Sequence, residues 1–262
     1  STASSCSFRI TAAEAPARGE LPRPRAVCLR TRPARWVPAR HTESESAMRL
    51  DAGCELEFEI LEPTPMLLML RPRSGDGQWV EEERYAISPR VPASEYADAW
   101  GNLCQRIVAR PGRLHISTQV RVDTDDTIAL APGAPRTPVD QLPVEVIGFL
   151  LASRYAESDA LADQARDVTA GATPGYDQVE AIRAWIHRSF EYRYGVSNES
   201  TSARDTLLER KGVCRDFAHV GIGLTRALGI PARFVAGYLH GLEPMDLHAW
   251  FEAWVDGRWY TF

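Results

Sequence analysis

Hydrophobic and polar residues alternate along two stretches in the first half of the chain. Residues 54–60 have the sequence Cys-Glu-Leu-Glu-Phe-Glu-Ile, and a second alternating set follows a Pro111-Gly112 turn, at Leu114, Ile116, Val120 and Val122. A period of two places successive side chains on opposite faces of a strand, one buried and one wet. The apolar run at residues 66–70 predicts a more buried strand. Residues 48–125 are therefore predicted to form an antiparallel β domain.

After a proline-rich link at residues 132–143, the pattern changes to a helical period. One apolar stripe predicts a helix, with further helical character at residues 146–151; the stripe consists of Val179, Ile182, Ile186 and Phe190. A second helix is predicted from Cys214, because Gly229 suits its C-terminal cap and Pro231 blocks continuation. Strands are predicted over residues 233–238 and 247–255, so the expected fold class is α+β.

Residues 1–47 differ in composition from the rest of the chain. They hold eight arginines and four glutamates, a charge of +4, against 22 basic and 31 acidic residues afterwards, a charge of −9. Prolines are frequent and apolar periodicity is weak, so this segment is predicted to be a disordered extension with Met48 as the natural start. A basic tail that grips an acidic partner is the alternative. The predicted domains are a β domain over 48–140 and an α+β core over 141–262.

Composition narrows the class of protein. The 262 residues are 44% hydrophobic and 25% charged, and the net charge of −5 gives no indication of nucleic-acid binding. The odd number and irregular spacing of the cysteines predict neither a disulfide framework nor a structural zinc site; they are Cys6, Cys28, Cys54, Cys104 and Cys214. A reducing, cytoplasmic setting is expected. With no 18-residue apolar run and no apolar leader, we expect neither membrane spans nor a secretory signal.

Cys214 and His248 stand in settings that suit nucleophilic catalysis. Cys214 begins a predicted helix, whose unpaired N–H groups and positive dipole end stabilise a thiolate. His248 lies at the start of a predicted strand, and a nearby imidazole can take the thiol proton and return it to a leaving group. Asp216 is expected to cap or charge the first turn of the helix. His219 is expected to be a packing or surface residue, and Cys54 and Cys104 to be inert.

Three blocks resemble the transglutaminase-like superfamily of papain-type cysteine enzymes. They are residues 212–218 (Gly-Val-Cys-Arg-Asp-Phe-Ala), residues 227–233 (Ala-Leu-Gly-Ile-Pro-Ala-Arg) with Gly237-Tyr238, and residues 248–252 (His-Ala-Trp-Phe-Glu). The match extends over residues 175–262, and residues 48–125, with Asp98–Asn102, resemble the β domain that precedes this core in a bacterial subgroup. The resemblance implies a β-sandwich-like domain followed by a papain-like core. It also implies a Cys–His–Asp triad, with Cys214 as nucleophile and His248 as general base and acid.

The third, acidic member of the triad is expected just after Phe262. An Asp256-Gly257 turn would pair Val255 with Arg258, so that residue 250 opposes position 263, a diagonal neighbour of His248 roughly 7–8 Å away. Other acids fit less well. Glu252 is roughly 13 Å along the strand from His248, Asp256 belongs to the turn, and Asp246 would need a bent loop. We therefore expect the third triad member to lie beyond this chain.

The predicted reaction is acyl transfer through a cysteinyl acyl-enzyme, with hydrolysis of a peptide or isopeptide-type amide favoured. Transfer to an amine, as in a transglutaminase, and a non-catalytic binding or assembly module are the alternatives. No cofactor or metal is expected, and the expected partner is a peptide or protein substrate. Tyr192, Tyr194 and Trp250 are candidates for substrate binding, although Trp250 and Trp254 would also suit the core. The Cys214 N–H is the expected first oxyanion donor, and the sequence does not assign the second.

Overall fold

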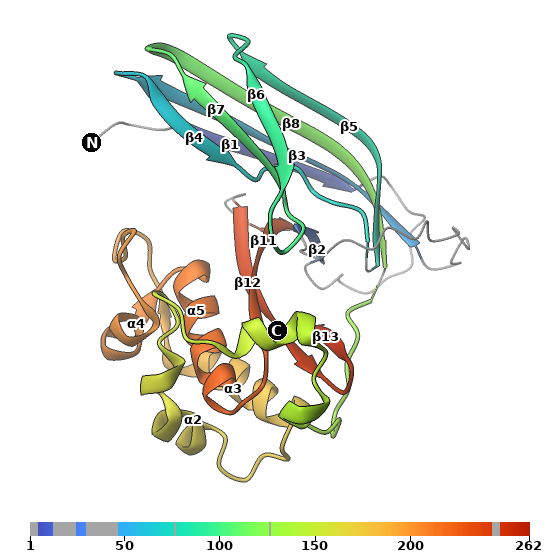
Figure 1. Ribbon diagram of the computed structural model, residues 1–262, viewed down its shortest axis with the longest axis vertical. Helices are drawn as coiled ribbons and strands as arrows, with labels where there is room; N and C mark the ends of the chain where they lie inside the picture. Colours follow the sequence, from blue (N-terminus) through green and yellow to red (C-terminus); the bar gives the residue numbers. More distant parts are fainter. Residues whose placement is uncertain (1–4, 13–24, 30–46, 76, 126, 243–246) are drawn as a thin grey trace. The chain divides into compact units, whose positions relative to one another are not determined.

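The computed structural model describes residues 5–12, 25–29, 47–75, 77–125, 127–242 and 247–262 (Figure 1). The chain divides into two compact units. The first unit comprises Ser1–Thr127 and Ala236–Leu247, and the second comprises Ile128–Val235 and His248–Phe262. This division lies upstream of the boundary predicted at 140/141, because the proline-rich link joins the second unit. There, the Tyr176 N–H donates to the Ala134 carbonyl at 3.0 Å.

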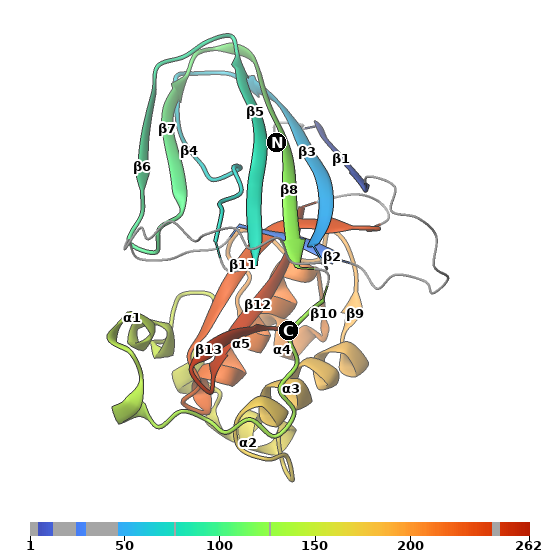
Figure 2. The ribbon, with the colours of Figure 1, turned by 90° about the vertical axis from the view of Figure 1, so that its right-hand side faces the viewer.

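The first unit contains two antiparallel sheets. One has the order β1-β3-β8-β5, with bounds Ser5–Ala12, Ala47–Ile60, Gly112–Asp125 and Gln78–Ser88. The other has the order β4-β7-β6, with bounds Thr64–Leu68, Leu103–Ala109 and Ala93–Ala97 (Figure 2). Both sheets contribute side chains to one buried cluster of Ile60, Leu68, Ile107, Ala109, Leu114 and Ile116. The predicted sandwich-like β domain is therefore confirmed.

Alternation along β3 and β8 matches the prediction. Every apolar residue that defined the β8 pattern is buried, whereas in β3 Leu56 and Phe58 are half-buried and alternate with exposed glutamates. The prediction of a more buried strand over residues 66–70 is wrong, because Leu67 is 66% exposed and Met69 53% exposed. Strand β4 ends at Leu68 and lies at the edge of its sheet. Only one face of β4 contributes to the sandwich core.

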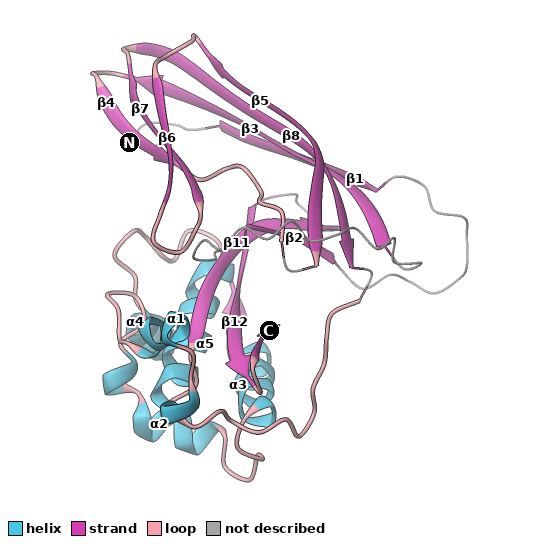
Figure 3. Ribbon diagram, turned by 45° about the vertical axis from the view of Figure 1, so that its right-hand side comes forward, coloured by secondary structure: helices cyan, strands magenta, loops and turns pink. Residues whose placement is uncertain are grey.

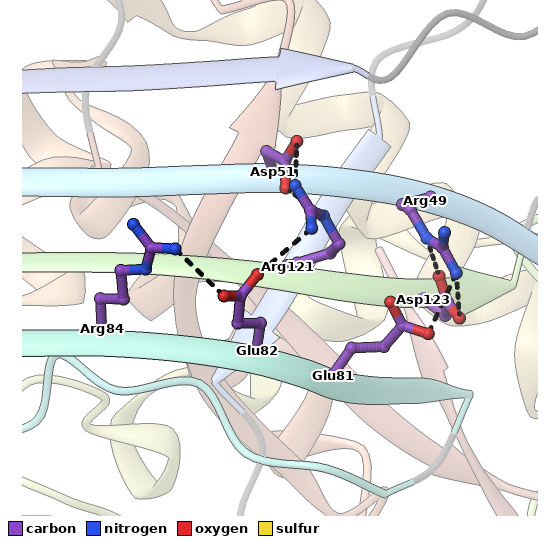
Figure 4. Close-up of polar contacts among 7 residues, drawn as sticks. All are labelled: Arg49, Asp51, Glu81, Glu82, Arg84, Arg121 and Asp123. Atoms are coloured by element: carbon purple, nitrogen blue, oxygen red, sulfur yellow. Dashed lines mark hydrogen bonds and ion pairs between the residues drawn. The ribbon is translucent and has the colours of Figure 1, made fainter.

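Charged side chains cover the outer face of the larger sheet (Figure 4). Arg49 contacts Glu81 and Asp123, each at 3.0 Å, and Arg121 contacts Asp51 at 2.9 Å and Glu82 at 3.2 Å. These pairs are largely exposed, and surface pairs of this kind contribute about 0–1 kcal/mol each. Their main effect is to keep one face of the sheet polar, which the strict alternation of β3 and β8 requires.

Two stretches of the predicted disordered segment 1–47 lie in strands. Strand β1 pairs antiparallel with β3, and β2 (Arg25–Leu29) pairs antiparallel with β11 (Ala232–His240). A segment with too few apolar residues to fold alone can still add to an existing sheet edge through main-chain hydrogen bonds. The prediction of disorder is corrected at these two places. Residues 1–4, 13–24 and 30–46 lie outside the described residues.

The second unit packs helices against a sheet (Figure 3). Its helices are α1 to α5, with bounds Val144–Ile147, Ala162–Val168, Tyr176–Ser189, Ala203–Glu209 and Cys214–Ala227. The sheet order is β13-β12-β11-β2, where β12 is Leu247–Val255, β13 is Arg258–Thr261, and β2 belongs to the first unit. The boundary between the units falls within β11 and β12. The α+β fold class is confirmed.

Helix α5 lies directly on the sheet. A Cβ atom added at Gly221 would collide with the Phe251 ring of β12, so the absence of a side chain at this position allows the close approach. Ile222 of α5 joins Ala253 and Val255 of β12 in the buried core. The predicted apolar stripe of α3 also faces inward, because Val179, Ile182 and Ile186 are buried. None of the described helices is both long enough and apolar enough to span a membrane.

The β12–β13 hairpin has the predicted turn and register. Asp256 and Gly257 have φ values of 46° and 81°, the left-handed pair that a two-residue type I′ turn requires. Val255 pairs with Arg258, and Glu252 pairs with Thr261. The Phe262 N–H donates to the Phe251 carbonyl at 3.0 Å. Extending this register by one residue places position 263 opposite Trp250.

Candidate active site

Cys214 is the first residue of α5. The preceding residue, Val213, is extended (φ −117°, ψ 179°), and its N–H donates to the Asp216 carboxylate at 2.9 Å. Asp216 therefore caps the helix, as predicted, and places a buried negative charge in the first turn. The N–H of Cys214 belongs to the first turn, whose N–H groups have no carbonyl partner within the helix. Cys214 itself is partly exposed and carries a free thiol.

Gly212 and Arg215 complete the cap. A Cβ atom at Gly212 would lie 2.9 Å from the Cβ and from a carboxylate oxygen of Asp216, which is too close for a real side chain. Arg215 contacts the Asp216 carboxylate at 2.7 Å and also donates to the Asn198 carbonyl at 2.7 Å. The Gly-x-Cys-Arg-Asp order therefore has a local cause: glycine makes room for the carboxylate that fixes the helix start at the cysteine.

Chain direction brings Cys214 and His248 to the same end of the second unit. Helix α5 ends at Ala227 and β11 begins at Ala232, so β11 runs back along the helix. Strand β12 is antiparallel to β11, since the Trp254 N–H donates to the Pro231 carbonyl at 2.8 Å near the start of β11. Helix α5 and β12 thus run in the same direction. Cys214 is the first residue of α5 and His248 is the second residue of β12, so the two predicted catalytic side chains lie where these elements begin.

Cys214 and His248 also lie at similar distances, along their own elements, from the point where α5 contacts β12. The contact between Gly221 and Phe251 fixes the relative height of α5 and β12. Cys214 lies seven residues before this contact along the helix, a rise of about 10 Å. His248 lies three residues before it along the strand, also about 10 Å. Both residues are partly buried at that end.

Tyr192 lies against Cys214. Strands β9 (Glu191–Tyr192) and β10 (Lys211–Gly212) form a short parallel pair in which Tyr192 is opposite Gly212. The Tyr192 hydroxyl lies close enough to Cys214 and to Tyr194 for both residues to affect its pKa. Burial and the adjacent thiol raise the pKa of the Tyr192 phenol. The phenol therefore keeps its proton at neutral pH.

The remaining aromatic residues predicted to bind substrate or pack in the core lie on the strand of Tyr192 or on the sheet. The ring of Tyr194 packs edge-on against Tyr192 at 5.4 Å, so the two predicted tyrosines lie against each other. Trp250 is partly buried on β12, two residues after His248, which puts both on one face of the strand. Trp254 packs edge-on against Trp259 at 5.4 Å. Trp254 thus belongs to an aromatic cluster on the sheet.

Two of the other acids considered for the triad, Glu252 and Asp256, lie among the described residues. The Glu252 carboxylate is buried and paired with Arg233 at 2.5 Å, so it is already engaged. Asp256 is exposed in the hairpin turn, and Asp246 lies outside the described residues. The sequence did not predict the partner of Glu252. Arg233 also covers the Trp259 ring, with the guanidinium carbon 4.1 Å from the ring centre.

His219 is a packing residue, as expected. Its imidazole is stacked between the rings of Tyr155 and Phe234, at 5.2 and 5.0 Å. Burial, and next the positive charge of Arg215, lower the pKa of His219 to about 4. His219 is therefore neutral at pH 7 and lies one and a half turns along α5 from Cys214, away from the helix start.

This lowered pKa predicts acid sensitivity. Between pH 6.5, the ordinary value, and pH 4, the unfolded chain binds a proton that the native chain does not. Stability should therefore fall as pH drops through this window, by up to about 3 kcal/mol. His219→Phe should reduce that loss, measured as urea midpoints at pH 7.5 and 4.5, whereas the exposed His187→Phe should not. Equal pH dependence in His219→Phe and the parent chain would contradict the prediction.

Comparisons with known proteins agree with this geometry. The family model of the transglutaminase-like superfamily matches residues 162–262, and that of the bacterial transglutaminase-like N-terminal region matches residues 61–123. A crystal structure from Cytophaga hutchinsonii, described as a "Putative Cysteine Protease", is 34% identical and has a TM-score of 0.78. That similarity covers 82% of this chain and 76% of the other.

Two relatives add to this picture. An uncharacterized protein of Mycobacterium leprae is 28% identical over 204 residues, which is 72% of each chain. A protein-glutamine gamma-glutamyltransferase of Pseudomonas aeruginosa is 35% identical over 107 residues. That last match covers 36% of this chain and 16% of the Pseudomonas enzyme. The similarity to the named enzyme therefore concerns one part of each protein.

Proposed function

The chain belongs to the transglutaminase-like superfamily, and from this premise we propose that it is an acyl-transfer enzyme with Cys214 as nucleophile and His248 as general base and acid. The observation that carries the proposal is the placement of both residues at the same end of α5 and β12. The capped helix start supports it, because its N–H groups and dipole favour a thiolate. The Cys214 N–H also provides a donor for an oxyanion.

The proposed reaction has two halves. His248 takes the proton of the Cys214 thiol, and the sulfur attacks the carbonyl carbon of an amide to form a C–S bond. The carbonyl then reforms, the C–N bond breaks, and the amine leaves with the proton held by His248. In the second half His248 takes a proton from the incoming acceptor, and the acceptor attacks the thioester carbon. The C–S bond then breaks, and the departing sulfur takes the proton back from His248, which regenerates the thiol.

We propose that an acidic residue at position 263 orients His248. The observed hairpin register supports this, because it sets that position opposite Trp250 and diagonal to His248. An acid there would fix the tautomer of the imidazole and stabilise its charged form. Glu252 is the acid that follows His248 on the same strand face, and its carboxylate is already paired with Arg233. This pairing supports position 263, rather than Glu252, as the source of the acid.

Water is the acceptor that we favour, which makes the protein a cysteine peptidase or amidase acting on a peptide or isopeptide-type amide. The cysteine-protease description of the Cytophaga relative supports this choice. The Pseudomonas relative supports a second candidate, transfer to an amine as in a transglutaminase. Incubation with benzyloxycarbonyl-Gln-Gly and dansylcadaverine separates the two. Amine incorporation faster than ammonia release without amine would favour the transferase.

The first test is selective alkylation by iodoacetamide, followed by peptide mass spectrometry between pH 5 and 9. An ordinary thiol ionises near about 8.5, whereas catalytic thiols ionise between about 3.5 and 7.5. We expect Cys214 to react rapidly below pH 7, while Cys54 and Cys104, both buried, do not. The test should be run on this chain and on one extended beyond Phe262. If Cys214 reacts like Cys54 in both, the acyl-transfer proposal fails and a binding or assembly module is favoured.

We also propose a cytoplasmic setting and a peptide or protein substrate. The free thiols of Cys104 and Cys214 support a reducing compartment. The exposed rings of Tyr192 and Tyr194 beside the nucleophile support contact with a substrate chain. Protection of these tyrosines from surface labelling by a trapped peptide would test that contact.

A further inference from the structure

The segment that leads into His248 is anchored in the core of the first unit. Strands β11 and β12 each have residues in both units, and the part that belongs to the first unit runs from Ala236 to Leu247. Tyr238 of β11 is completely buried there, in a cluster with residues of β3 and β8. Leu247, the first residue of β12, packs against the same cluster. The residue directly before the proposed general base is therefore held by the core of the first unit.

The cluster around Tyr238 is apolar. Its other buried members come from β3 and β8 and are Leu50, Ala52, Cys54, Val120 and Val122. The Tyr238 hydroxyl, at the far end of the ring, donates to the Leu70 carbonyl at 3.4 Å. Protein cores are packed as densely as organic crystals, so a ring enclosed in this way cannot shift without opening a cavity. The packing of Tyr238 therefore fixes the position of this part of β11.

The register of β11 and β12 sets Leu247 beside Tyr238. The Trp254 N–H donates to the Pro231 carbonyl at 2.8 Å, which defines the register of these two antiparallel strands. Continued along the strands, this register places Leu247 opposite Tyr238. Opposite residues share one face of a sheet, in agreement with the packing of both side chains in one core. Successive side chains alternate between faces, so the imidazole of His248 projects from the other face of β12.

We propose that Leu247 and Tyr238 are positioning residues, through which the core of the first unit holds His248 in place for its reaction with Cys214. The inference rests on the proposed acyl transfer. The link is the chain itself, because Leu247 is fixed by its packing and His248 is the next residue. A general base has to lie within about 2.6–3.2 Å of the atom whose proton it takes. A misplacement of about 1 Å can lower the rate by about 10²-fold, so weaker packing at Leu247 or Tyr238 should slow catalysis.

The test measures acylation of Cys214 by p-nitrophenyl acetate in Leu247→Ala, alone and combined with His248→Ala. A residue that acts through His248 has no further effect once His248 is absent, because residues that act as a unit are not additive. We expect Leu247→Ala to slow acylation by about 10–10²-fold in the parent chain and by less than about twofold in His248→Ala. Tyr238→Leu should behave in the same way. Tyr238→Phe, which keeps the ring in the core, should recover most of the rate lost in Tyr238→Leu.

Ile107→Val is the matched control. Ile107 is buried in the cluster between the two sheets of the first unit, whose described members all precede β11 in the chain. The substitution costs about 0.5–1.5 kcal/mol of stability and should leave acylation at the parent rate.

Four results would overturn the inference. The first is acylation at the parent rate in Leu247→Ala or in Tyr238→Leu. The second is an equal loss in Ile107→Val, which would mean that any loosening of the first unit slows the reaction. The third is an equal loss from Leu247→Ala with and without His248, which would mean an effect on Cys214. The fourth is an equal loss in Tyr238→Phe, since the ring is still packed. Failure of the acyl-transfer proposal is visible separately, because the parent Cys214 would then lack selective alkylation.

Discussion

Replacing His248 with alanine is expected to slow acylation of Cys214 by about 10²–10⁴-fold, the usual contribution of a general acid–base residue. The reason is that the thiol proton loses its acceptor while the helix start, its cap and the Cys214 N–H remain in place. His248 lies at the start of β12, ahead of the tightly packed part of the strand around Phe251 and Ala253. The substitution should therefore leave the fold intact.

The burst of p-nitrophenol release from p-nitrophenyl acetate measures this step directly. His187→Ala is the control, because His187 is an exposed histidine of the same unit and its loss should leave the burst unchanged. Added imidazole should restore part of the rate to His248→Ala, since it can enter the space left by the ring. A burst in His248→Ala within threefold of the parent would remove His248 from the mechanism.

The parts of the site that the sequence predicts correctly depend on local signals. Gly229 and Pro231 end α5, and the Asp256-Gly257 turn sets the register of β12 and β13. Each of these signals acts over a few residues through backbone conformation or a cap. Because α5, β11 and β12 are joined by short connections or a hairpin, local signals also determine the direction of the three elements. The shared end of Cys214 and His248 follows from those directions.

The features that sequence reasoning missed depend on sheet order and long-range contact. Strand β4 has the composition of a buried strand, yet its place at a sheet edge leaves Leu67 exposed. Tyr192 reaches Cys214 through two-residue strands 20 residues apart, which are too short to show a period. The position of Tyr192 ahead of the nucleophile segment in the sequence indicates only weakly that it lies near Cys214.

The buried pair of Arg233 and Glu252 is the clearest such case. The hydrophobic pattern of the two strands does not indicate a buried charge at either position. The pair joins residues that are 19 apart in the sequence and lie on neighbouring strands. Both side chains are almost fully buried, at 4% and 1% exposure. A charge placed there is tolerated because its partner comes from the adjacent strand, which only the β11–β12 register determines.

Glu252→Gln is therefore expected to destabilise the second unit by about 3–5 kcal/mol. The substitution keeps the size of the side chain but removes the charge that compensates the buried Arg233 guanidinium. The loss of stability should appear as a lower midpoint of urea unfolding. Tryptophan fluorescence can monitor this unfolding, since Arg233 lies over the Trp259 ring. Glu180→Gln is the matched control. It breaks an exposed pair with Arg183, a kind of pair that contributes about 0.2–1 kcal/mol.

A second variant separates the charge from the packing. Arg233→Met combined with Glu252→Gln removes both charges and should recover much of the stability lost in Glu252→Gln, because a neutral pair needs no compensation. The Thr261 hydroxyl donates to the Glu252 carboxylate at 3.4 Å, but the β12–β13 register should be unaffected, since the main-chain pairing of Glu252 with Thr261 does not need the carboxylate. Suppose instead that Glu252→Gln lowers the free energy of unfolding by less than about 1 kcal/mol. Water would then reach both side chains in solution, and neither charge would depend on the other. The ion pair would not be what holds β11 against β12.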